Sequence, residues 1–183
     1  KKEMLHLFII IIDMKTKTLL YLFLFFSISI QAQDKVMDSL QSEFKKVKND
    51  IDKTKVLNAI ADQYKYSDPT KMAEYGNQAL QLAKKINYKV EEGNAYLNIG
   101  TSNIILGDYK KALDNFSLAK DIFENNPSST NKKEISQGLA KTYGSMGIVF
   151  SEQSNYAKAL QFYSLVSHKI LWLYKKTSHL IQI

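Results

Sequence analysis

The chain matches itself when it is shifted by 47 residues, and this internal repeat limits its possible folds more than any other feature. The stretch 95–119, AYLNIGTSNIILGDYKKALDNFSLA, aligns with 142–166, TYGSMGIVFSEQSNYAKALQFYSLV. Eight of the 25 aligned positions are identical, among them Gly100 with Gly147. A glycine costs a helix interior about 1 kcal/mol relative to alanine. Its recurrence inside a helical pattern therefore indicates a repeated packing contact.

Both copies place an aliphatic-glycine pair after an aromatic residue, and then an alanine and a second aromatic residue. These residues are Tyr96, Ile99, Gly100, Ala112 and Phe116 in the first copy, and Tyr143, Met146, Gly147, Ala159 and Tyr163 in the second. The spacing resembles the tetratricopeptide repeat (TPR). The resemblance implies two short antiparallel helices in each repeat. It places Gly100 and Gly147 at the helix contact, opposite Ala112 and Ala159, with the aromatic residues beside them.

A more divergent copy over 56–86 precedes these two. Its Ile60 and Ala61 lie 39 residues before Ile99 and Gly100, and Asp68-Pro69 has the form of an N-cap followed by a proline at the first helical position. Asp108 and Asn155 are the corresponding N-caps of the later copies. We therefore predict an all-α solenoid of about three TPR-like helix pairs over residues 34–166. The expected helices are 34–48, 53–66, 69–86, 88–106, 108–124, 131–153 and a last one from 155.

The N-terminal region reads as an export signal. Met14 and two lysines precede the apolar run LLYLFLFFSISI at 19–30, which is shorter than the roughly 20 residues that span a bilayer. We predict a signal peptide over 14–33 and a periplasmic location, with an uncleaved membrane anchor as the alternative. Residues 1–13 read as an upstream segment outside the native protein.

The C-terminal residues 167–183 lie outside the self-similarity. They contain the one tryptophan of the chain and two of its three histidines. Two interpretations stay open for this tail: a capping helix that closes the solenoid, or the product of a truncation or a frame slip.

The formal charge of +7 does not indicate a nucleic-acid partner. Most of the excess lies in 1–33 and after 166, which leaves +2 for residues 34–166. All basic residues are lysine, whereas arginine is the favoured residue for bidentate contacts with phosphate and guanine. We therefore expect no nucleic-acid binding, and membrane association only through the signal segment or a downstream region.

Residues 34–166 contain neither histidine nor cysteine. Zinc sites of the Cys/His kind, and catalysis by either residue, are therefore excluded from this region. No glycine-rich phosphate loop is present either. We predict a protein without cofactor, metal site or catalytic residues. A hydrolase with an unrecognised carboxylate site is a weaker alternative.

By resemblance to the family, the first helices of the repeats line a concave groove that binds a protein or peptide. Eight residues are the candidates for this groove: Asn58, Asp62, Asn94, Leu97, Asn98, Thr101, Lys141 and Ser145. Asparagine and threonine can form hydrogen bonds with a peptide backbone. A clamp for a C-terminal carboxylate, known in the family, is not expected. Asn98 and Lys141 match that pattern, but Asp62 would repel the carboxylate.

Two hypotheses of function share this groove. In the first, the chain is an exported TPR scaffold for protein or peptide binding without catalysis. In the second, it is the truncated sensor region of a membrane-bound signalling protein. The signal segment, the divergent first repeat and the long spacing resemble the N-terminal periplasmic regions of bacterial sensor histidine kinases and nucleotide cyclases. Nothing catalytic carries over from that resemblance.

Overall fold

The computed structural model describes residues 17–18, 21, 35–126 and 132–178, and for residues 169–178 it describes the backbone alone. The chain divides into two compact units, Lys1–Ser42 and Glu43–Ile183. In the first unit, the described residues are helical, including 35–42. Residues 1–16, 19–20 and 22–34 lie outside the described part, so the predicted signal peptide stays a prediction.

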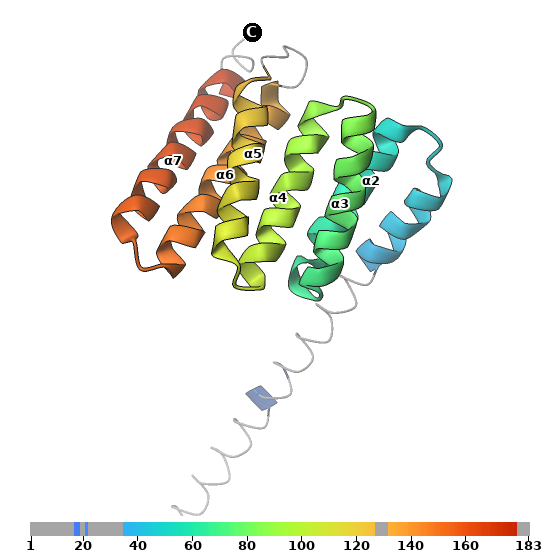
Figure 1. Cartoon of the computed structure of the whole chain (residues 1–183), viewed down its shortest axis with the longest axis horizontal. Coiled ribbons are helices and arrows are strands. Elements are labelled where there is room, and N and C mark those ends of the chain that lie inside the picture. The colour runs from blue at the N-terminus through green and yellow to red at the C-terminus, as the bar shows by residue number, and fades with distance from the viewer. Residues whose placement is uncertain (1–16, 19–20, 22–34, 127–131, 179–183) are drawn as a thin grey trace, which may run out of the picture. The chain divides into compact units, whose positions relative to one another are not determined.

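The second unit is built from helices that follow one another as antiparallel neighbours (Figure 1). The elements are α2 (Asp50–Gln63), the 3₁₀ turn η1 (Tyr64–Tyr66), α3 (Pro69–Lys85), α4 (Lys89–Ile105), α5 (Tyr109–Glu124), α6 (Lys132–Glu152) and α7 (Tyr156–Ser178). Helices α2 and α3, α4 and α5, and α6 and α7 form three pairs, and α3 packs on α4 as α5 packs on α6. The predicted all-α solenoid of three TPR-like helix pairs is confirmed.

The predicted N-caps are confirmed at the starts of α3, α5 and α7. The Asp68 carboxylate accepts hydrogen bonds from the backbone N–H groups of Thr70 and Lys71, both at 3.0 Å. Asp108 accepts one from the N–H of Lys111 at 3.1 Å, and the side chain of Asn155 accepts one from the N–H of Lys158 at 3.2 Å. Each bond satisfies a donor that the first helical turn leaves without a partner.

Helix α2, which was predicted to span residues 53–66, begins and ends earlier than predicted. Asn49 accepts a hydrogen bond from the backbone N–H of Asp52 at 2.8 Å, so α2 starts at Asp50 rather than at residue 53. It ends at Gln63, where the chain tightens into η1. At the other end, α7 continues without a break past residue 166 as far as Ser178. The first part of the tail is therefore helical and continuous with the last repeat.

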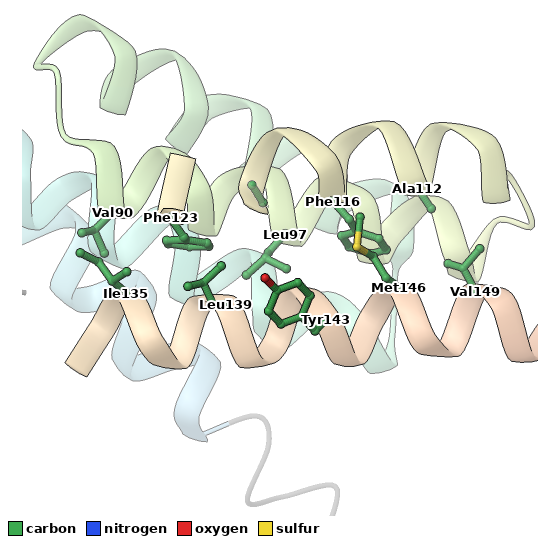
Figure 2. Packing of buried hydrophobic residues seen from close by; sticks show 11 residues of the cluster. Val90, Leu97, Ala112, Phe116, Phe123, Ile135, Leu139, Tyr143, Met146 and Val149 are labelled. Atoms are coloured by element: carbon green, nitrogen blue, oxygen red, sulfur yellow. The ribbon is translucent and has the colours of Figure 1, made fainter. Parts of the chain in front are cut away.

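The main hydrophobic core lies between α4, α5 and α6 (Figure 2). Phe123 on α5 is buried among residues of the two neighbouring first helices, close to Val90 and Ile135. A Cβ atom added at Gly93 would lie 2.6 Å from the Phe123 ring, and one added at Gly138 would lie closer still. The ring is therefore held between two glycines, one on α4 and one on α6.

The repeated glycines face the repeated aromatic rings. A Cβ atom on Gly100 would lie 2.5 Å from Cε1 of Phe116, and one on Gly147 would lie 2.5 Å from Cε1 of Tyr163. Ala112 and Ala159 are buried on the same second helices, but the atoms closest to each glycine belong to the ring. The absence of a side chain at Gly100 and Gly147 thus makes room for an aromatic residue rather than for a close approach to alanine.

Tyr143 joins α6 to the end of α5. Its hydroxyl donates a hydrogen bond to Oε1 of Glu124 at 2.5 Å, and only 7% of the residue is exposed. Burial raises the pKa of Tyr143 above its usual value of 10.0, and the Glu124 carboxylate raises it further. The folded protein therefore holds this proton at a pH at which the unfolded chain loses it.

This difference predicts a stability loss at alkaline pH. Because the folded-state pKa is raised, the Tyr143 contribution is complete below the unfolded pKa of 10.0 and declines as the pH rises above it. In Tyr143→Phe, we expect the free energy of unfolding to fall less steeply from about pH 9 to 11 than in the wild type. Urea titrations at successive pH values measure this slope. Parallel curves for the two proteins would contradict the assignment.

Candidate functional site

The first helices of the three pairs, α2, α4 and α6, line an open hollow of about 870 Å³. The eight residues that the sequence singled out for a groove all lie along it: Asn58, Asp62, Asn94, Leu97, Asn98, Thr101, Lys141 and Ser145. The structure thus brings them together on one surface. Their side chains are used in different ways, and this divides the surface into a floor, a polar rim and an apolar end.

The floor is held together by a buried polar network between α2 and α4. The Asn58 amide nitrogen donates hydrogen bonds to the backbone oxygen of Glu91 at 3.0 Å and to its Oε2 at 2.7 Å. The Asn98 amide nitrogen donates to the backbone oxygen of Asn58 at 3.0 Å and to its Oδ1 at 3.1 Å. All three residues are buried. The amide groups of both asparagines therefore fix the distance between the two helices.

The network also fixes which way the Asn98 amide points. If nitrogen and oxygen were exchanged, its oxygen would face two other oxygens of Asn58, an arrangement without a donor. Among the described residues, no buried side-chain nitrogen or oxygen lacks a partner. Oδ1 of Asn98 is therefore open to the hollow, where it can accept a hydrogen bond. Leu97, which is also buried, contributes an apolar part of the floor.

The polar rim consists of side chains that leave hydrogen-bonding capacity toward the hollow. Asn94, Thr101 and Ser145 are half-buried there. The Thr101 hydroxyl donates to the backbone oxygen of Leu97 at 2.8 Å, which leaves its oxygen lone pairs as acceptors. Asn94 offers both a donor and an acceptor, the pair of groups that one peptide unit can match.

Charges of both signs surround the rim. Lys55 and Lys65 lie on the α2 side and Lys141 on α6, whereas Asp62 is the exposed carboxylate of the hollow. The Lys55 ammonium lies 5.8 Å from the centroid of the Tyr88 ring. Interaction with Tyr88 raises the pKa of Lys55 above its usual value, so it is a cation at any physiological pH. The hollow therefore favours neither a strongly acidic nor a strongly basic ligand.

One end of the hollow is apolar, which the sequence did not reveal. Tyr66, Ile105 and Ile148 line it, and their side chains are exposed. Tyr66 lies in η1 directly after α2, Ile105 ends α4, and Ile148 lies near the end of α6. The three residues therefore come from three different repeats. Sequence analysis missed them because each one alone is an ordinary apolar residue near a helix end. Only the stacking of the repeats collects them.

Asp62 and Lys141 both line the hollow, on α2 and α6. A carboxylate-terminated ligand in the hollow would therefore meet the carboxylate of Asp62. Among the described residues, no group of His, Asp or Glu side chains is arranged to hold a metal ion. None of the helices in the described ranges is both long enough and apolar enough to cross a bilayer.

No family model matches the chain, and no curated protein matches it. Among solved structures, the crystal structure of MamA is similar, with 15% sequence identity and a TM-score of 0.39. The match covers 80% of this chain and 94% of that one. A likeness at this level does not indicate a shared function.

Proposed function

We propose that the protein is an exported scaffold that binds a peptide or an extended segment of another protein in the hollow of α2, α4 and α6, without catalysis. The observation that carries this proposal is the free hydrogen-bonding capacity of Asn94, Thr101, Ser145 and Asn98 Oδ1 along one open surface. An extended backbone presents N–H and C=O groups at regular intervals, and these side chains can bond to both kinds.

The apolar end supports a more specific ligand. Tyr66, Ile105 and Ile148 can cover one large apolar side chain of the peptide, and aromatic or aliphatic anchors supply most of the affinity in such interfaces. The mixed charges nearby do not require a charged ligand. We therefore propose a largely neutral segment with an apolar residue at one end.

Export is the second part of the proposal. It rests on the apolar run at 19–30 behind Met14 and Lys15. A sensor region of a membrane-bound kinase or cyclase is the second candidate, favoured by the same signal segment and by the spacing of the repeats. In that case the hollow would be the input site of the signalling protein.

The peptide proposal can be tested with a displayed library of short random peptides. We expect selected peptides to share an apolar residue and to bind the wild-type chain. In the double variant Asn94→Ala/Ser145→Ala, the affinity for the best peptide should fall about 10-fold, since each lost hydrogen bond costs about 0.5–1.5 kcal/mol. Calorimetric titration measures the dissociation constants, and thermal unfolding should be unchanged.

Asn77→Ala is the matched control. Asn77 is an exposed asparagine on α3, a second helix, and its amide donates to the Ala73 backbone oxygen of its own helix at 2.8 Å. We expect its loss to leave binding unchanged. Peptides that bind the double variant as tightly as the wild type would place the binding site elsewhere. A library without any binder would argue against peptide recognition itself.

A further inference from the structure

Two oxygen atoms of α4 line the hollow as hydrogen-bond acceptors without a hydrogen to donate. Both amide hydrogens of Asn98 are used in its bonds to Asn58, and the hydroxyl hydrogen of Thr101 is used in its bond to the Leu97 backbone oxygen. Asn98 and Thr101 are three positions apart, so they are neighbours on one face of the helix, about 4.5 Å apart along its axis. This part of the hollow therefore needs donors from a ligand.

The buried network makes this polarity permanent. Turning the Asn98 amide alone would place its oxygen against two oxygens of Asn58. Turning both amides together would place Oδ1 of Asn58 against the backbone oxygen and Oε2 of Glu91, again without a donor. No arrangement of the two amides points an N–H of Asn98 into the hollow. Asn58 thus acts as a positioning residue for Asn98.

The facing side of the hollow, on α6, supplies donors. Ser145 stands 47 positions after Asn98, at the equivalent place in the next repeat, and α6 is in contact with α4. Ser145 is half-buried, and within the described ranges its hydroxyl has no hydrogen-bond partner, so it can donate to a ligand. Lys141, one turn earlier, carries donors alone. A ligand between the two helices thus meets acceptors on α4 and donors on α6.

A primary carboxamide matches this pattern. Its NH2 group directs two hydrogens toward acceptors on the order of 5 Å apart, close to the axial separation of Asn98 and Thr101, and its oxygen can accept from Ser145. A backbone amide has a single N–H, and a carboxylate has none. An ammonium or guanidinium group has no acceptor for Ser145. It would also enter a hollow lined by three lysines and two acidic residues: Lys55, Lys65, Lys141, Asp62 and Glu91.

We propose that Asn98, Thr101 and Ser145 form a subsite for a side-chain carboxamide, that of a glutamine or asparagine in the bound segment. This subsite rests on the peptide binding proposed above and specifies one residue of the peptide. Ile105, in the apolar end of the hollow, follows Thr101 by one turn of α4. The carboxamide residue should therefore lie within about three positions of the large apolar residue in an extended peptide.

A displayed library of random seven-residue peptides tests the subsite. We expect the selected peptides to share a glutamine or asparagine within three positions of a large apolar residue. The tightest-binding peptide is then synthesised with this carboxamide either unchanged or N,N-dimethylated, which removes both donors and keeps the carbonyl oxygen. Dimethylation should weaken binding to the wild-type chain about 10-fold or more. Calorimetric titration measures both dissociation constants.

Thr101→Val separates a lost hydrogen bond from the added bulk of the methyl groups. The variant lacks one of the two acceptors, so dimethylation should weaken its binding by only about 3-fold. A purely steric effect would be the same in both proteins. Thr101→Ser is the matched control, because it keeps the hydroxyl and should keep the wild-type ratio. Circular dichroism should show unchanged folding of both variants.

Three results would overturn the subsite while peptide binding stands: selected peptides that carry lysine or arginine in place of the carboxamide, binding that tolerates dimethylation, or a dimethylation effect unchanged in Thr101→Val. A library without any binder would overturn the peptide proposal and the subsite together. The two failures are therefore distinguishable.

Discussion

Replacing Phe123 by alanine is expected to lower the free energy of unfolding by about 3–5 kcal/mol, the usual cost of removing a buried phenylalanine. The ring is 1% exposed and lies between Gly93 of α4 and Gly138 of α6. Neither glycine has a side chain that could move into the space. The cavity would therefore persist, and the contact between the second and third helix pairs would weaken.

Urea unfolding followed by circular dichroism measures this loss. Tyr66→Ala is the control, because it also removes an aromatic ring but from a side chain that is 77% exposed. Its effect should stay within about 0.5 kcal/mol. Equal effects of the two substitutions would contradict the packing of Phe123 between the glycines. A separate, early transition in Phe123→Ala would show that the third pair unfolds independently.

Adding a methyl group at Gly100 is expected to destabilise the protein much more than adding one at Gly147. Both new Cβ atoms would start 2.5 Å from an aromatic carbon. Phe116 is fully buried and has no space to move into, whereas Tyr163 is 38% exposed and can turn outward. We expect Gly100→Ala to cost about 2–3 kcal/mol through overpacking. Gly147→Ala should cost less than about 1 kcal/mol, since the gain in helix propensity offsets much of the strain.

The comparison needs thermal and urea unfolding of both variants at the same protein concentration. Gly144→Ala is the control, because a Cβ atom there would be 3.9 Å from Val166, an ordinary contact distance. This variant should be neutral or slightly stabilised. A larger loss for Gly147→Ala than for Gly100→Ala would mean that the Tyr163 ring is held in place on its outer side.

The fold could be predicted from the sequence because the residues of one packing contact, a glycine and an aromatic ring, recur in two repeats. Gly100 and Phe116 recur as Gly147 and Tyr163, and the structure shows these residues in contact. The first repeat is harder to recognise because it reverses the sizes. Ala61 stands in place of the first-helix glycine, and Gly76 stands in place of the aromatic residue. A Cβ atom at Gly76 would lie 3.0 Å from Ile99 of α4, so the next helix fills the space.

The arrangement of Phe123 with Gly93 and Gly138 could not be found by self-comparison. The residues 47 positions from these three are Ile170, Ala140 and Glu91, so this contact occurs once in the described chain. The buried network of Asn58, Glu91 and Asn98 was also missed, although both asparagines were groove candidates. The residues that form its hydrogen bonds are 33 and 40 positions apart in the sequence. No local sequence pattern shows which asparagine side chain will form hydrogen bonds with a neighbouring helix.

That network has a consequence for how this surface can change during evolution. The amide nitrogens of Asn58 and Asn98 are committed to holding α2 against α4, so a substitution at either position would disturb the architecture. The network does not include the rim residues Asn94, Lys141 and Ser145, which line the hollow. Selection can therefore act on the rim and the floor separately. Descendants of this protein could exchange one ligand for another through a few rim substitutions while they inherit the same packing of α2 against α4.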